Sequence, residues 1–117
     1  MIASLDHVVL TVRSIDETVR FYTEILGMKK EVFAEGRIAL KFGTKKINLH
    51  QLGHEFEPKA AFPTSGWAGI CFITHLPIQD AYDHVSAKGI NILEGIVARS
   101  GAQGQSSHFI SETLIKI

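Results

Sequence analysis

The two halves of this 117-residue chain carry the same order of sequence patterns, and this repeat constrains the fold more than any other feature. Each half has an apolar, β-branched stretch, then an amphipathic stretch that ends at a glycine, then shorter strand-like stretches. The two glycines, Gly27 and Gly89, are 62 residues apart, and the same offset relates His7 to Gly69. One four-stranded sheet with one helix leaves a sheet face uncovered, so two such units should pair. The repeat therefore predicts an α+β fold, in which two βαβββ units form a curved mixed sheet around a cleft.

The first half shows the clearest helix signals. Ser14 and Glu17 have the Ser-x-x-Glu spacing of a capping box, which predicts that a helix begins there. Gly27 suits the left-handed residue that ends such a helix. Alternating apolar residues and turn signals predict strands on both sides of the helix. These expected strands are 5–12, 28–34, 37–42 and 46–51.

The second half repeats this order with weaker signals. An apolar strand over 67–74 precedes Pro77, which is well placed in the first turn of a helix. We expect that helix to end at Gly89, with a strand over 90–93 after it. The glycine-containing stretch 94–105 is expected to be loop-rich, and 106–110 and 113–117 to be weak strands. We thus predict one domain over 1–117, with unit 1 at about 4–52, a linker at about 53–66 and unit 2 at about 67–117. The alternative is an unrelated small α+β protein with two similar strand–helix patterns.

Charge and composition exclude several classes of function. Twelve Lys and Arg balance twelve Asp and Glu, so the chain has no net charge with which to bind nucleic acid by bulk attraction. No apolar run approaches the roughly 20 residues of a membrane span. The first residues lack the order of a signal peptide, and the single cysteine, Cys71, suits a reducing compartment. We therefore expect a cytoplasmic protein that binds neither nucleic acid nor membranes.

Several segments carry a family resemblance. The stretches LDHVVLTV, RFYTEILGM and RIALKFGTKKINLHQ resemble the vicinal oxygen chelate superfamily, which includes glyoxalase I, bleomycin-resistance proteins and extradiol dioxygenases. The stretch EFEPKAAFPTSGWAGICFIT, followed by EGIVARSGAQG, is similar to the branch of glyoxalase-domain proteins with dioxygenase-related or unassigned activity. The resemblance covers about residues 4–104. It implies a glyoxalase-like domain of paired βαβββ units around a cleft, as the repeat predicts.

The resemblance also implies metal-ligand positions on the first and last strand of each unit. In the first unit these positions hold His7 and His50. In the second unit the first position is Gly69, which has no ligand atom. The last position depends on the alignment: the internal offset gives Glu112, whereas alignment from the chain end gives Lys116. The family's terminal Phe-x-Asp-Pro-Asp-Gly-Asn-x-x-Glu segment is absent, so this choice stays open.

With Glu112 as third ligand, the site would suit a divalent ion such as Fe, Mn, Ni or Zn. Such an ion would chelate two adjacent oxygens of a small substrate and stabilise the negative charge that develops on them. The resemblance thus implies a metal-dependent lyase, isomerase or dioxygenase, with Glu112 also as its catalytic carboxylate. Without the resemblance, His7 and His50 would be read as hydrogen-bonded core histidines.

A second hypothesis is a metal-free protein that binds or sequesters a small aromatic or antibiotic molecule. Gly69 and the missing terminal segment favour it. A cleft-facing Lys116 would repel a divalent cation and hold an anionic ligand instead. The competing interpretation of Lys116 is a solvated residue near the chain end.

Four further residues are candidates for contact with the small-molecule ligand. Phe42, Trp67 and Phe72 would form apolar walls, as is common in ligand sites. His108 lies in a strand-like stretch and would face the cleft. The competing interpretation of the three aromatic residues is a place in the core, where aromatic residues of strands more often lie.

The divergent last part of the chain has two further interpretations. A frameshift or a recombined gene end would explain why the resemblance stops near Gly104. A shortened last strand would also leave a sheet edge open. Pairing of two chains covers such an edge, with or without exchange of whole units. We therefore expect a homodimer.

Overall fold

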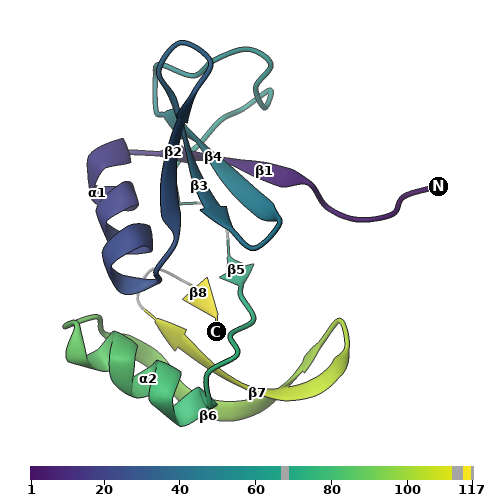
Figure 1. Cartoon of the computed structure of the whole chain (residues 1–117), viewed down its shortest axis with the longest axis vertical. Coiled ribbons are helices and arrows are strands. Elements are labelled where there is room, and N and C mark those ends of the chain that lie inside the picture. Colours follow the sequence, from purple (N-terminus) through teal and green to yellow (C-terminus); the bar gives the residue numbers. More distant parts are fainter. Residues whose placement is uncertain (67–68, 112–114, 117) are drawn as a thin grey trace. The chain divides into compact units, whose positions relative to one another are not determined.

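The computed structural model describes residues 1–66, 69–111 and 115–116. It divides into two compact units, Met1–Trp67 and Ala68–Ile117. Each unit contains one four-stranded mixed sheet and helical structure in the order βαβββ, so the predicted α+β class and the repeat are confirmed (Figure 1).

Unit 1 places its first strand at an edge of its sheet, beside its last strand. The strand order is β1-β4-β3-β2, with β1 parallel to β4 and the other neighbours antiparallel. Its elements are β1 (His7–Val12), α1 (Ile15–Arg20), the π-helical turn η1 (Phe21–Ile25), β2 (Lys29–Phe33), β3 (Arg37–Phe42) and β4 (Lys45–Gln51).

The helix of unit 1 begins and ends where the sequence predicts. The Ser14 hydroxyl accepts a hydrogen bond from the Glu17 amide at 3.2 Å, which satisfies one of the free donors of the first turn. The helix widens into a π-helical turn at Phe21, and Gly27 then takes a left-handed φ of 73°. Gly89 does the same after the second helix, with φ 81°. The two glycines therefore have the same conformation in the two units.

The two faces of the unit 1 sheet differ sharply in polarity. Alternate residues of a strand point to opposite faces. One face carries Leu10, Leu40, Ile47 and Leu49, all buried, and the helical segment packs on it. The other face is called the polar face here, and it consists of His7, Val9 and Thr11 of β1, Lys46, Asn48 and His50 of β4, Arg37, Ala39 and Lys41 of β3, and Lys29, Glu31 and Phe33 of β2.

Unit 2 repeats the topology with a very short first and last strand. Its strand order is β5-β8-β7-β6, with β5 parallel to β8. Its elements are β5 (Ile70–Cys71), α2 (Ile78–Ala87), β6 (Ile92–Gly101), β7 (Gly104–Ser111) and β8 (Ile115–Lys116). Ala81 and Val85 of α2 are buried, and Tyr82 packs edge-on against Phe109 of β7 with ring centroids 5.4 Å apart.

The expected loop over 94–105 is wrong, because this stretch forms most of a long β-hairpin. Strands β6 and β7 pair from Ile92 and Ser111 to the turn between Gly101 and Gly104. The register shifts on both sides of Glu94, next to Gly95. A glycine at a bulge and two at a turn are compatible with a hairpin, so their density misled a prediction of loop structure.

No helix in the described ranges is both long enough and apolar enough to cross a membrane.

Candidate functional site

The polar face of unit 1 gathers several of the candidate residues and their charged neighbours. The backbone register places Thr11 beside His50, Val9 beside Asn48 and His7 beside Lys46. Because the helical segment covers the opposite face, polar side chains on this face are the ones available to a ligand.

His50 is a buried imidazole on the polar face, with 6% of its surface exposed. Its ring meets Phe56 edge-on, with centroids 5.9 Å apart. Burial lowers the pKa of His50 below its usual 6.5, and the nearby Arg37 guanidinium lowers it further. The imidazole is therefore neutral at physiological pH, with one nitrogen as donor and the other as acceptor.

Two cations on the polar face lie over aromatic rings. The Arg37 guanidinium is 4.5 Å from the centroid of Phe56, and the Lys46 ammonium is 4.2 Å from that of Phe33. In the register, Lys46 and Phe33 lie on opposite sides of Ala39, which is completely buried. The stem of Lys46 therefore spans Ala39.

Asn48 is a polar residue that the sequence analysis missed. It lies between His7 and His50 along the polar face, and its Oδ1 is buried without a hydrogen-bond partner in the described structure. A buried carbonyl oxygen without a partner is costly, and at this position it offers an acceptor to a ligand of the polar face. The signal was present in the sequence, since alternation in INLHQ puts Asn48 on the face of His50.

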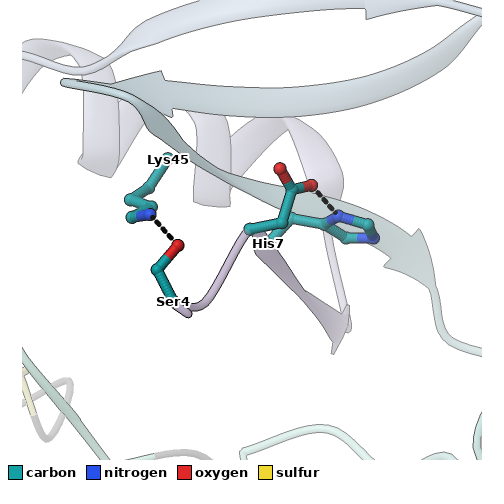
Figure 2. Close-up of polar contacts among 4 residues, drawn as sticks. Ser4, His7 and Lys45 are labelled. Carbon is teal, nitrogen blue, oxygen red and sulfur yellow. Dashed lines mark hydrogen bonds and ion pairs between the residues drawn. The ribbon is translucent and has the colours of Figure 1, made fainter. Parts of the chain in front are cut away.

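His7 lies at the opposite end of the polar face from His50. Its Nδ1 is 2.7 Å from a carboxylate oxygen of Asp6, and this hydrogen bond lowers the pKa of Asp6. Figure 2 shows this contact and the nearby hydrogen bond from Lys45 to Ser4, at 3.2 Å. His7 pairs with Lys46, and His50 pairs with Thr11, so the imidazoles share a face but are four residues apart along it. Four residues of strand measure about 13 Å.

The described residues do not provide the three-ligand metal set that the resemblance implies. Within residues 1–66, 69–111 and 115–116, no group of three or more His, Cys, Asp and Glu side chains could hold a metal ion. Glu112 lies outside the described residues, so its metal and catalytic roles stay predictions.

The register of unit 2 bears on the last ligand position. Cys71 of β5 pairs with Lys116 of β8, whereas Val9 of β1 pairs with Asn48 of β4. Val9 and Cys71 correspond by the 62-residue offset, so the strand position of Lys116 corresponds to that of Asn48. In this register Lys116 is the counterpart of Asn48 and not of His50, so the choice between Glu112 and Lys116 at the last ligand position stays open.

The predicted ligand-contact residues lie in different parts of the structure. Phe42 is half-buried on the helix-covered side of the unit 1 sheet, opposite the polar face. Phe72 is half-buried just after β5, and Trp67 lies outside the described residues. His108 is buried in β7, where its Nε2 is 2.8 Å from the Ser106 hydroxyl, and its Nδ1 has no partner in the described part. The contact roles of all four stay predictions.

Comparison with known proteins adds the family. Residues 4–106 match the family model described as Glyoxalase/Bleomycin resistance protein/Dioxygenase superfamily. The chain is 51% identical over 105 residues to Virulence protein STM3117 of Salmonella typhimurium, covering 90% of this chain and 73% of that protein. It is 50% identical over 103 residues to glyoxalase domain-containing protein RDO1 of Mycosarcoma maydis. That match covers 88% of this chain but only 58% of the relative's length.

A solved structure agrees with this result. An integron cassette protein from the mobile metagenome of V. cholerae is 51% identical, with a TM-score of 0.92. The match covers 99% of this chain and 94% of that chain.

Proposed function

We propose a function for a chain that belongs to the glyoxalase/bleomycin resistance protein/dioxygenase superfamily: it binds a small molecule on the polar face of its first sheet. The observation that carries the proposal is the buried, neutral His50, held among Arg37 and Phe56 on this face. The unpartnered Asn48 oxygen beside it supports the same assignment. This function does not require a metal.

The proposal is tested by mapping ligand binding onto the unit 1 sheet. We would screen small aromatic and oxygen-rich compounds by thermal shift in the presence of a chelator, because ligands of the native state raise the melting temperature. Amide chemical shifts of the complex should then change at Asn48 and His50. The variant His50→Gln should weaken binding, whereas His75→Gln, at an exposed histidine of unit 2, should not. Binding that maps only to the helix side, or that survives His50→Gln unchanged, would contradict the proposal.

The second candidate is a divalent-metal enzyme that uses His7, His50 and Glu112 on a vicinally oxygenated substrate. The observation that favours it is the Asp6–His7 hydrogen bond. Metal-binding histidines commonly have one ring nitrogen bonded to a carboxylate, which leaves the other nitrogen for the ion. Fe, Mn, Ni and Zn are the ions to consider.

Metal analysis separates the two candidates. The protein would be purified without a histidine tag and titrated with each ion. About one equivalent of tightly bound metal, lost in both His7→Ala and Glu112→Gln, supports the enzyme. Less than about a tenth of an equivalent, with no binding on reconstitution, contradicts it and leaves the metal-free function.

We also propose that the chain is a homodimer in solution, because β1 is an apolar edge strand of the unit 1 sheet in the described structure.

A further inference from the structure

The polar face of unit 1 carries an excess of positive charge although the whole chain has none. Four cations, Lys29, Lys41, Lys46 and Arg37, share this face with one carboxylate, Glu31. Glu31 is 3.4 Å from the ammonium of Lys41 and so compensates that cation. The charge of the chain is therefore unevenly distributed, with the excess cations on the face where we place the ligand.

Among the described residues, neither Lys46 nor Arg37 forms an ion pair with a carboxylate, although the charge of Lys46 helps to lower the pKa of the exposed Asp6. Each contacts an aromatic ring instead. Arg37 is also the register partner of Phe33, the ring that the Lys46 ammonium contacts. The Lys46 ammonium therefore lies near the strand position of Arg37, whose guanidinium contacts the neighbouring ring of Phe56.

The carboxylates of the loop after β4, Glu55 and Glu57, already have other partners. Glu57 is 3.9 Å from Lys59, and its backbone oxygen, not its carboxylate, accepts from Arg37 at 3.4 Å. Glu55 accepts a hydrogen bond from the Gly53 amide at 3.0 Å, which helps to lower the pKa of the Glu55 carboxyl. A contact between a cation and an aromatic ring at a partly exposed site is worth little, so an incoming anion can displace it.

The remaining groups around these cations suit an organic ligand. Phe33 and Phe56 offer ring surface, and neutral His50 and Asn48 offer uncharged hydrogen-bonding groups beside it. A carboxylate or phosphoryl group would gain charge-assisted hydrogen bonds from both cations, which are stronger than neutral ones.

The geometry points to a small organic anion as the ligand of the polar face, with its carboxylate or phosphoryl group held between Lys46 and Arg37 and its apolar part against Phe33 and Phe56. This inference rests on the proposed function, because it names the ligand class of the same site. Lys46 and Arg37 act here as binding residues that select for charge.

Matched probes test the inference. Benzoate and phenylphosphonate carry the expected charge, whereas benzamide and benzyl alcohol have the same ring without it. Binding of each to the full chain would be measured by titration calorimetry, with amide shifts to locate it. We expect the anions to bind at least about tenfold more tightly than the neutral probes, and to lose affinity as salt rises.

Charge-removing variants complete the test. Lys46→Met keeps a stem over Ala39 but removes the charge, and should weaken anion binding about ten- to hundredfold while leaving benzamide binding unchanged. Arg37→Gln is the second variant, in case the first does not fold. Lys30→Met is the matched control, because Lys30 is an exposed residue of β2 on the opposite face.

The outcomes separate this inference from the proposed function. If benzamide binds the polar face as well as benzoate, and Lys46→Met changes neither, the charge selection is wrong while the small-molecule site stands. If neither anion shifts amides of the polar face, the inference is also overturned. The broader compound screen then decides the proposed function independently.

Discussion

At the residue scale, the state of His50 follows from its position in β4. The neighbouring Leu49 faces the helical segment and is buried, so His50 faces the other way, onto the polar face. Phe56 and Arg37 enclose it there, and both burial and the guanidinium charge disfavour the imidazolium form. A neutral imidazole can accept a hydrogen bond, which a charged one cannot.

The lowered pKa of His50 predicts a pH dependence of stability. Because the folded protein holds this proton less tightly than the unfolded chain, protonation favours unfolding. The contribution is complete above the ordinary pKa of 6.5 and is lost as the pH falls through the lower folded value. His50→Gln should therefore flatten the fall in unfolding free energy on acidification, measured by denaturant titration in a pH series. A ring titration by NMR with a midpoint at or above 6.5 would disprove the explanation.

Asn48 allows stability and binding to be separated at one residue. Its buried Oδ1 has no partner in the described structure, so replacing the amide by an apolar group of similar shape removes a desolvation cost. We expect Asn48→Leu to raise the free energy of unfolding by about 1 kcal/mol and yet to weaken binding of the anionic probes. Denaturant unfolding and calorimetry measure the two effects. A clear loss of stability would mean that the amide has a structural role instead.

At the scale of elements, the sequence predicts well those helices and strands that depend on local residue patterns. It predicts poorly those that depend on pairing between strands. The expected strand 37–42 is β3 itself, because its alternation is regular and a turn precedes it. The prediction of a loop over 94–105 is wrong. Single glycines disfavour helices and strands, but the pairing of β6 with β7 in a hairpin outweighs this tendency. One of the two hydrogen bonds of the predicted capping box is confirmed: the Glu17 amide donates to the Ser14 hydroxyl.

Loss of the N-cap hydrogen bond at Ser14 should measurably lower the stability of the folded chain. Ser14→Ala removes the acceptor of the Glu17 amide, and N-cap losses cost about 1 kcal/mol. The short helix α1 has few other means to satisfy its first turn, so we expect that full cost in denaturant unfolding. Ser107→Ala, at an exposed strand position, is the control and should change stability by less than about 0.5 kcal/mol. Equal effects of the two substitutions would show that the cap contributes nothing.

The two glycines that end the helices should be equally costly to replace, as measured by the loss of stability. Gly27 and Gly89 have left-handed φ angles of 73° and 81°, and a Cβ at either would meet no atom within 4 Å. Substitution by alanine is therefore a purely conformational penalty of about 1–2 kcal/mol. Gly95→Ala is the comparison, since that glycine has no such φ. Thermal unfolding should show matching losses for Gly27→Ala and Gly89→Ala, and a loss at only one would argue against equivalent roles.

At the scale of the whole molecule, the sequence predicts the repeat and the face but not the site. The family resemblance implies that His7 and His50 line one cleft, and the strand register puts both on one face of the sheet. Their separation depends on the stagger between β1 and β4, which no local pattern encodes. The contacts of Lys46 with Phe33 and of Arg37 with Phe56 are equally hidden, because they join residues from different strands and a loop.

The edges of the sheets bear on how many chains assemble. In the described structure β1 is an edge strand with β4 as its single neighbour, and it is six residues long and rich in Val and Leu. An apolar edge strand of this kind tends to pair with another strand. In unit 2 the corresponding edge strand, β5, has only two residues. We therefore propose that two copies associate, with or without exchange of units, and that β1 takes part in the contact.

A homodimer predicts specific results for measurements of mass and stability. Light scattering after size exclusion should give twice the mass of one chain, and the melting temperature should rise with protein concentration, because association stabilises the folded state by mass action. Hydrogen exchange should then slow in β1 as the concentration increases. A chain that stays monomeric across this range, with a melting temperature independent of concentration, would require β1 to be covered within its own chain. In that case the polar face would have to bind its ligand without any residue from a second copy.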